Sequence, residues 1–417
     1  VVVAWGGYMD AGDWDRRVQH LSASIAKLEL FELFPQTFED LTLMLPPDEV
    51  GNYLPDLIDE ALWNLDLYRR LQHDDGGVPG GVESAEHPVF GETSWQESLD
   101  IFVFAPDPWA SYLYAGAAAR LAYVLQDHDT ALADTYARSA EDAFAWAEAR
   151  HPELVKRHGE ARKFWRIRDA RNLSSLELYR LTEEPAYHDI FTQQTSLADP
   201  DAPVGLWGSH HDHAAAFIYA RLDDRLADPS IKKRAKAALL EEADFGIEYL
   251  EANAFNLTAT HRDMPYHWGL YGSPDAAITL LRADYLADDD RYLGAALLAA
   301  NYSAGANPMN TTFMSGLGSR FPLNIHHLDS RRTGQDPPRG VPVYGQYDPK
   351  DSLAQDDNVR WPMTWVFDPR NIPAGTDWPA NEAYFDVFSN IAHNEFTVHQ
   401  SQRPSVHVWG YLAARPR

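Results

Sequence analysis

The chain has no cysteine among its 417 residues, which excludes disulfides and thiol chemistry. Basic residues are also scarce: 35 Lys and Arg stand against 62 Asp and Glu, a formal net charge of −27. Such a surface repels nucleic acid and anionic membranes, and it suits a neutral or cationic ligand. No apolar run approaches the roughly 18–20 residues of a membrane span, and the first four residues lack the basic start of a signal peptide. We therefore expect neither a nucleic-acid nor a membrane partner.

The sequence also lacks a convincing two-residue alternation, so we expect no β-strands. Helical periods are frequent instead: Val18, Leu21, Ile25 and Leu28 recur at intervals of three and four. Helices are predicted over residues 14–34, 54–73, 109–126, 131–150, 165–183, 186–197, 211–227, 231–252, 274–287, 291–304, 381–392 and 404–414. Paired helices of this kind predict an all-α toroid with its long connections gathered at one end. No linker divides residues 1–417, so we expect a single domain.

Residues 305–379 have a different composition: they are rich in Pro, Gly, Asp and Arg and show no sustained hydrophobic periodicity. A structureless segment of this length in a compact domain is usually functional or disordered. Because it also contains many Trp and His residues, we interpret it as ordered loops over a site. The 13 Trp and 20 Tyr of the chain further suggest a stacking surface for flat ligands.

Two carboxylates lie three residues apart near the start, in the stretch Gly-Gly-Tyr-Met-Asp-Ala-Gly-Asp-Trp-Asp at residues 6–15. Asp10 and Asp13 would repel each other unless a polar group lies between them. A water accepted by both and deprotonated by one is a general-base arrangement. The alternative is structural, because Asp13 could cap a helix that begins near Trp14.

Residues 6–13 resemble the Gly-Gly-x-x-Asp-Ala-Gly-Asp signature of glycoside hydrolase family 9, the cellulases built on an (α/α)6 barrel. Five further segments resemble family motifs in the same order: 54–61, 75–78, 307–308 with 315–319, 326–327 and 394–395. The resemblance implies an (α/α)6 catalytic domain over residues 1–417. The first barrel helix of the family precedes the Asp motif, so we expect a barrel without that helix. Many members also carry an N-terminal immunoglobulin-like domain, which this sequence does not contain.

The resemblance implies an inverting mechanism with three carboxyl groups. Asp13 would be the general base that takes a proton from water, and Asp10 would hold the same water. Glu395 would be the general acid. Its pKa must then be raised by burial or by acidic neighbours, and Phe396 beside it would exclude water.

Sugar contacts are also implied. His326 and His327 would donate hydrogen bonds to sugar hydroxyls, and Arg331 or Arg332 would replace a family Arg where this chain has Leu328. The candidate stacking platforms are Trp95, Trp109, Trp207, Tyr266, Trp268, Trp361 and Trp365. A core role remains open for each, since large aromatics often pack inside.

We expect no metal and no cofactor in the reaction. His326, His327 and Asp329 invite a zinc interpretation, but such a site needs three ligands in the correct geometry. The run His210-His211-Asp212-His213 is expected to begin a barrel helix, with Asp212 in its first turn. The family often carries structural calcium, and no loop here identifies a site for it.

The expected function is hydrolysis of β-1,4-glucan, as a polysaccharide or oligosaccharide, by a secreted or periplasmic enzyme. One alternative is an exo-acting β-D-glucosaminidase on chitosan oligosaccharides, because Glu83 or Glu86 could bind the ammonium group of an amino sugar. Another is a non-catalytic carbohydrate-binding barrel, against which the complete set of Asp10, Asp13 and Glu395 argues.

Overall fold

The computed structural model describes residues 4–45, 51–158, 164–201, 204, 211–266, 269–287, 289–350, 370 and 377–415. Its main helices form two layers. The inner layer consists of α1 (Leu21–Leu33), α4 (Pro108–Leu125), α7 (Phe164–Thr182), α9 (His211–Arg221), α11 (Ala277–Leu286) and α17 (Arg403–Ala414). Each inner helix packs on the next, and α17 closes the ring on α1.

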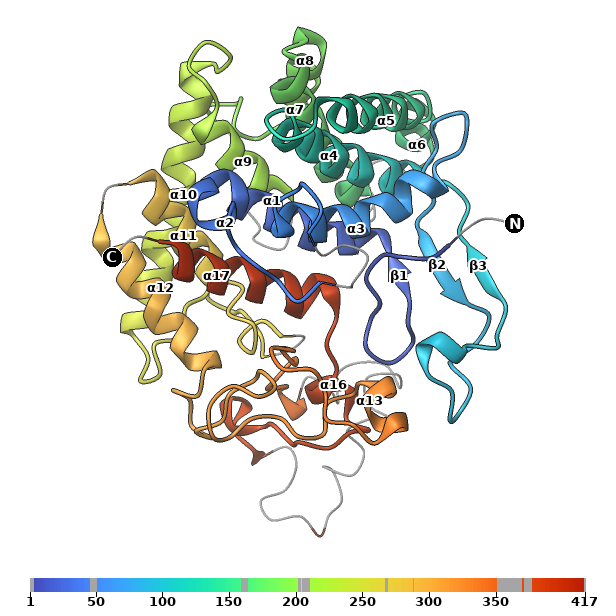
Figure 1. Ribbon diagram of the computed structural model, residues 1–417. Coiled ribbons are helices and arrows are strands. Elements are labelled where there is room, and N and C mark those ends of the chain that lie inside the picture. The colour runs from blue at the N-terminus through green and yellow to red at the C-terminus, as the bar shows by residue number, and fades with distance from the viewer. Residues whose placement is uncertain are drawn as a thin grey trace.

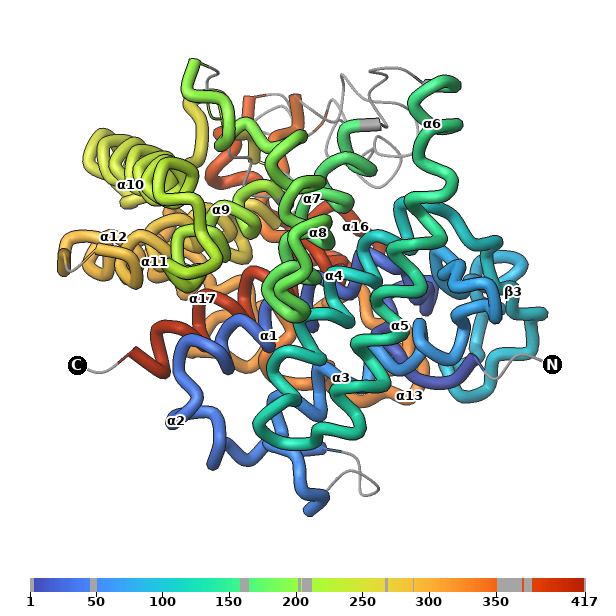
Figure 2. Tube along the Cα trace, turned by 90° about the horizontal axis from the view of Figure 1, so that it is seen from above, coloured from blue at the N-terminus to red at the C-terminus, as the bar shows by residue number. Residues whose placement is uncertain are grey.

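The outer layer consists of α3 (Asp56–Leu71), α5 (Thr130–Glu148), α8 (Pro185–Gln194), α10 (Pro229–Glu251) and α12 (Asp290–Ser303). They pack on α1, α4, α7, α9 and α11 respectively, so successive helices form hairpins. Seen from above, α10 and α12 lie at the rim, outside α9 and α11 (Figure 2). The expectation of an all-α toroid is confirmed, and α17 is the inner helix without an outer partner among the described residues.

Local sequence signals explain where several of these helices begin. Asp107 accepts a hydrogen bond from the Ala110 backbone at the start of α4, and Asp129 accepts one from Leu132 at the start of α5, each at 3.0 Å. These carboxylates satisfy backbone N–H groups that have no partner within the helix. Further along α4, residues 115–119 are fully buried and all small, which allows α5 and α7 to approach closely.

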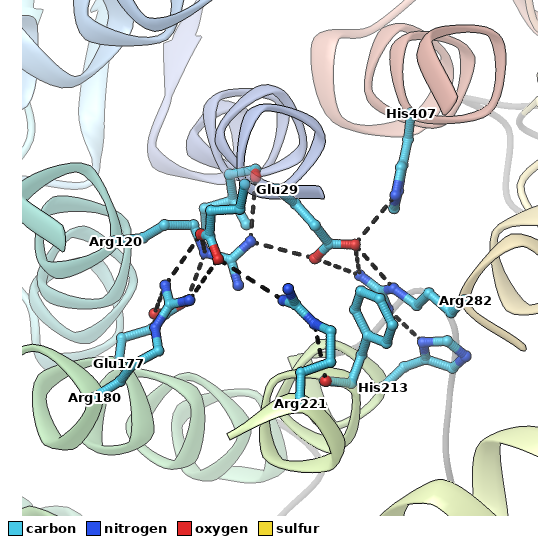
Figure 3. A network of polar contacts seen from close by, with 11 residues as sticks. Glu29, Arg120, Glu177, Arg180, His213, Arg221, Arg282 and His407 are labelled. Carbon is cyan, nitrogen blue, oxygen red and sulfur yellow. Dashed lines mark hydrogen bonds and ion pairs between the residues drawn. The ribbon is translucent and has the colours of Figure 1, made fainter. Parts of the chain in front are cut away.

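A network of buried charges crosses the middle of the inner ring (Figure 3). Every inner helix contributes to it: Glu29 and Glu32 from α1, Arg120 from α4, Glu177 and Arg180 from α7, His213 and Arg221 from α9, Arg282 from α11, and His407 from α17. The carboxylate of Glu29 accepts from Arg282 Nη2 at 3.0 Å and from Arg120 Nη1 at 3.2 Å. Burial alone would raise the pKa of Glu29, but Arg282, His407 and Arg120 together hold it well below its usual range.

Replacing Glu29 with Gln should therefore destabilise the barrel. The side chain is 1% exposed, and the variant would leave the buried guanidinium of Arg282 without its carboxylate partner and remove one of the carboxylates around Arg120. Removing one partner from a buried ion pair typically costs about 3–5 kcal/mol. Because the folded-state pKa of Glu29 is lowered, its contribution is complete above the unfolded pKa and is lost as the pH falls through the folded one. Urea unfolding at neutral and acidic pH measures both effects.

The matched control for that measurement is Glu251→Gln, since Glu251 lies exposed at the end of α10. Exposed substitutions usually change stability by no more than about 0.5 kcal/mol. Equal unfolding midpoints for the Glu29 and Glu251 variants would contradict a stabilising role for the network.

A small antiparallel sheet lies beside the barrel, at the right of Figure 1. Its strands are β1 (Arg16–Arg17), β2 (Gly81–Ser84) and β3 (Ile101–Val103), in the order β1-β2-β3. Val82 pairs with both Arg16 and Val103. The prediction of no strands is therefore wrong, because strands of two to four residues are too short for an alternating pattern to show.

The remaining helices are short: α2 (Pro35–Phe38), α6 (His151–His158), α13 (Leu328–Thr333) and α16 (Ile391–Asn394), with the 3-10 turns η1 (Val18–His20), η2 (Ser94–Gln96) and η5 (Ala380–Glu382) and the π-helical turn η6 (Val398–Gln402). The predicted helix over 381–392 is wrong. Asp386 in its middle accepts from the Leu323 and Asn324 backbones, at 2.8 and 2.9 Å, so this segment is held by distant loops.

The loops of residues 305–350 and 377–400 gather at one end of the barrel, at the bottom of Figure 1 beneath α12 and α17. A second hydrophobic cluster supports them, with Phe313, Val343 and Phe396 buried in it. Among the described residues, no helix has the length and apolarity needed to cross a lipid bilayer.

Candidate active site

The Asp motif and Glu395 meet because they precede neighbouring inner helices. Residues 6–15 lead into η1 and α1, while Glu395 leads into η6 and α17, which packs on α1. The backbone N–H of Val398 donates to Oδ1 of Asp10 at 2.9 Å, joining two segments that are 388 residues apart in the sequence. The structure thus brings Asp10, Asp13 and Glu395 to one end of the barrel.

Both carboxylate oxygens of Asp10 have partners. Oδ1 accepts from Val398, and Oδ2 lies 3.0 Å from Nε2 of His20, whose side chain is fully buried. The Asp10 backbone N–H also donates to the Asp15 carbonyl at 3.1 Å. Asp10 is therefore held in one orientation by groups on both sides of it.

Asp13 is more loosely held and is electrostatically perturbed. Within the described part of the chain, its Oδ1 accepts a single long bond, of 3.4 Å, from the Asp15 backbone N–H. Burial, and then the neighbouring charge of Asp10, raise the pKa of Asp13, and Arg17 and His87 partly oppose that rise. The first helical turn begins at Val18, so Asp13 caps no helix, and that alternative is wrong.

Glu395 has the environment of a carboxylic acid that stays protonated at neutral pH. Burial, followed by the charges of Asp13 and Asp10, raises its pKa to about 8. Its backbone is fixed, because its carbonyl accepts from the Tyr344 N–H at 3.0 Å and the Asn394 carbonyl accepts from His326 at 2.8 Å. Phe396, at 7% exposure, packs beside it. Glu395 can give a proton while Asp13 can take one, which is the division of roles that acid–base hydrolysis requires.

The backbone of the motif is strained at one residue and crowded at another. Trp14 has φ of 57°, in a region that residues other than glycine rarely occupy and that is often found at functional sites. A Cβ on Gly12 would collide with the imidazole Nε2 of His326. Only glycine therefore lets the histidine loop lie directly against the two Asp residues.

His326 and His327 both lie at the site, but they differ in what they can offer a ligand. Nδ1 of His326 lies 3.0 Å from the Phe388 carbonyl, which can only accept, so the proton is on Nδ1 and Nε2 is an acceptor. Nδ1 of His327 accepts from the Ser330 backbone at 3.2 Å, so its Nε2 carries the proton. Burial lowers the pKa of both rings and keeps them neutral. The expected donation fits His327; the proton on Nδ1 turns His326 into an acceptor.

The two candidate arginines are engaged with aromatic rings. The guanidinium of Arg331 lies over Phe388 at 5.2 Å, and that of Arg332 lies over Trp14 at 5.2 Å. Arg332 also donates to the Glu92 carbonyl. Asp329 accepts from the Ser94 backbone at 2.7 Å, so α13 holds the loop between β2 and β3 against the site.

The matching family model, described as glycosyl hydrolase family 9, covers residues 2–401. The chain belongs to this family. Among curated proteins it is 27% identical to an endoglucanase C of Cellulomonas fimi, covering 94% of this chain and 36% of that protein. It is 24% identical to a xyloglucan-specific endo-β-1,4-glucanase of Bacteroides ovatus, and the match covers 95% of this chain and 67% of that protein.

Solved structures agree with the fold. A metagenome-derived family 9 endoglucanase matches with a TM-score of 0.81 and 25% identity, over 99% of this chain and 72% of that one. An endoglucanase D of Acetivibrio thermocellus is 21% identical over 94% of this chain, which spans 58% of that relative's length. The (α/α)6 barrel expected from the family motifs is thus the fold observed.

The aromatic candidates in this family 9 chain have mixed positions. Trp109 is half-buried in the first turn of α4, and Tyr266 is half-buried with its ring 4.5 Å from that of Tyr271. Trp95 is 69% exposed. Trp207, Trp268, Trp361 and Trp365 lie outside the described residues. Their roles as platforms stay predictions.

Two histidine runs were considered above as possible metal ligands, one at His326-His327 and one that includes His211 and His213. In the described part of the chain, neither run forms a cluster of potential metal ligands. His327 caps α13 through Nδ1, and the Asp329 carboxylate is taken up by Ser94. The run that includes His211 begins α9, with Asp212 in its first turn, as expected.

Three histidines near the carboxylates were not predicted from the sequence. His20 bonds to Asp10, and His399 has its ring centroid 6.0 Å from that of His20. His87, exposed in the loop after β2, acts electrostatically on both Asp13 and His326. The one signal available was spacing, because His399 follows Glu395 by four residues and would share its side of a helical turn.

Proposed function

We propose that this chain is a family 9 catalytic domain that hydrolyses β-1,4-glucan with inversion at the anomeric carbon. The observation that carries the proposal is the pairing of Glu395, whose pKa burial raises to about 8, with the Asp10–Asp13 pair. Glu395 donates its proton to the leaving glycosidic oxygen. Asp13 takes a proton from water as the water oxygen attacks the anomeric carbon, and Asp10 orients that water.

The engagement of Asp10 supports this division of labour. With Val398 on one oxygen and His20 on the other, Asp10 is a fixed acceptor rather than a free base or nucleophile. Among the described residues Asp13 has no such pair of partners, and burial raises its pKa, which makes it a stronger base than an ordinary Asp. An acid and a base with a water between them is the arrangement used by inverting glycosidases.

Two observations support the proposed substrate: the names of the relatives and the ion pair that Glu83 makes. The named relatives are endoglucanases and an endo-β-1,4-glucanase. Glu83 lies 2.9 Å from Nη2 of Arg17, so its charge is already paired and is a poor ligand for an amino sugar. This favours glucan over chitosan oligosaccharides. A polymeric substrate does not enter cells, so a secreted or periplasmic location accompanies this proposal.

Product analysis by NMR tests the proposal directly. Cello-oligosaccharides, xyloglucan oligosaccharides and chitosan oligosaccharides are digested in parallel, and the first anomeric signals are recorded before mutarotation. We expect α-configured reducing ends from the β-linked glucan and no release from chitosan oligosaccharides. Initial β-configured products would exclude inversion, and an inert panel would leave the chain as a binding barrel.

A plot of kcat/KM against pH should be bell-shaped, with both of its limbs at higher pH than ordinary carboxyl groups would give. Activity falls above about pH 8, because Glu395 then loses the proton it must donate. The midpoint of the acidic limb should lie above the pKa of about 3.9 that is typical of Asp, because the pKa of Asp13 is raised. The pH profile on cellotetraose measures both limbs, which report the coupled carboxyl groups as a set.

Asp10→Asn provides the internal check on that profile. It removes a negative charge that raises the pKa of Glu395, so the alkaline limb should move to lower pH. Asp263→Asn, at an exposed loop position, should leave the limb in place. An alkaline limb that is the same in both variants would count against the electrostatic coupling.

A further inference from the structure

A cluster of three potential metal ligands shares Asp10 with the candidate active site. One ligand atom each from Asp10, His20 and His399 comes within 4.8 Å of the other two. They come from three separate turns: the Asp motif, η1 and the π-helical turn η6. Nothing in the hydrolytic mechanism uses His399, and its buried Nδ1 has no hydrogen-bond partner among the described residues.

The hydrogen bonds of His20 place its ring between the backbone and Asp10. Its Nδ1 lies 3.0 Å from the Tyr8 carbonyl and 3.4 Å from the Arg17 backbone N–H, which donates to it. Its Nε2 lies 3.0 Å from the Asp10 carboxylate oxygen, to which it can donate a proton. A metal ion bound here would take the place of that proton. A backbone carbonyl on the far nitrogen of a histidine is also the usual support for a metal-binding imidazole.

The local backbone supplies the third ligand. The π-helical turn Val398–Gln402 sets the Val398 N–H on Asp10 and stacks the ring of His399 against that of His20, with 23° between the planes. Arg403 Nε fixes the turn by donating to the His399 carbonyl at 3.2 Å. Insertions of this kind in helices are frequent at functional sites.

We propose that Asp10, His20 and His399 bind one divalent transition-metal ion of the Zn²⁺ class, and that the bound ion slows hydrolysis. Two imidazoles and one carboxylate are ligands that Zn²⁺ accepts. Tetrahedral ligand atoms about 2.0–2.1 Å from zinc lie roughly 3.3 Å apart, and the three ligand atoms here already lie within 4.8 Å of one another. His399 and Asp10 are partly exposed, so an ion can reach these two ligands from solvent.

Inhibition follows from the shared ligand, and this half of the proposal rests on the proposed function. An Asp10 oxygen bound to a metal cannot also hold the attacking water. The ion also puts positive charge beside Asp13, which makes that carboxylate a weaker base. Zinc at this site therefore acts against the hydrolytic arrangement rather than through it.

Equilibrium dialysis of the purified chain against zinc sulfate, after removal of metals with EDTA, tests the site itself. We expect one zinc per wild-type chain and an affinity lower by about a hundredfold or more in His399→Gln, since a lost ligand costs at least as much as a lost supporting partner. His261→Gln, at an exposed loop position, is the matched control and should bind like wild type. Wild-type affinity in His399→Gln, or no bound zinc in the wild type, overturns the proposal.

The second measurement separates the site from its effect. Release from cello-oligosaccharides is recorded with zinc, without zinc and after EDTA, and each protein is compared with its own zinc-free rate. We expect reversible slowing of wild type and of His261→Gln, and loss of that sensitivity in His399→Gln. Zinc that binds without slowing the wild type overturns the inhibitory role. If the chain releases no sugar from any glucan, dialysis still decides the site. Circular dichroism melting confirms that His399→Gln is folded.

Discussion

Glu395→Gln should lower the hydrolysis of cello-oligosaccharides by about 10³-fold, within the range attributed to general acid–base catalysis. Glutamine has nearly the same shape but no proton of suitable acidity, so the leaving sugar must depart as an alkoxide. Because Glu395 is proposed to act on the transition state, the loss should appear in kcat with little change in KM.

The leaving group provides the diagnostic for this variant. An aryl cellobioside with an acidic phenol needs no protonation, so its cleavage should be largely spared in Glu395→Gln. Glu86→Gln, at an exposed position in the loop after β2, is the matched control and should behave like wild type on both substrates. Equal losses on both substrates would mean that Glu395 does something other than protonate the departing oxygen.

The carboxyl groups of the candidate site could be selected from the sequence because they lie in short local motifs. The Gly-Gly-x-x-Asp-Ala-Gly-Asp pattern and the Asn394-Glu395 pair stand out in the sequence. The fold then had to place them together, and it does so because they precede α1 and α17, which are neighbours only once the ring closes. A helical period indicates each helix, but it does not reveal which helices close the ring.

Features that depend on distant backbone groups could not be predicted. The proton position on His326 is set by the Phe388 carbonyl, 62 residues away. The segment around Asp386 was predicted as helix, because its hydrogen bonds to Leu323 and Asn324 cannot be inferred from local pattern. Glu29 likewise looks like an ordinary surface charge until Arg282, 253 residues away, is seen beside it.

His20 and His399 show the same limit at the site itself. His20 is an isolated histidine in a predicted helix, and His399 lies between two predicted helices, so a histidine with an ordinary structural role is the usual interpretation of each. Only the π-helical turn after Thr397 brings His399 beside Asp10 and His20, and no sequence period indicates such a turn. Sequence motifs therefore pointed to Asp10, Asp13 and Glu395 as candidates, while the groups that orient them required the structure.

Asp13→Asn should lower the hydrolysis of both cello-oligosaccharides and the aryl cellobioside by about 10³-fold or more. The reason is that no group then accepts the proton of the attacking water. This is the contrast with Glu395→Gln, since a good leaving group does not replace a missing base. A small anionic nucleophile such as azide, which needs no deprotonation, should restore cleavage of the aryl cellobioside. Asp263→Asn is the matched control at an exposed position.

Stability should move in the opposite direction in the same variant. The pKa of Asp13 is raised by burial and by Asp10, so its charged form is disfavoured in the folded state and costs stability at neutral pH. Removing that charge should raise the melting temperature while hydrolysis is lost, as expected where an active site holds like charges together. A variant that melts at a higher temperature and still releases sugar at the wild-type rate would contradict the proposed role. It would show that the unfavourable charge of Asp13 is not needed to activate water.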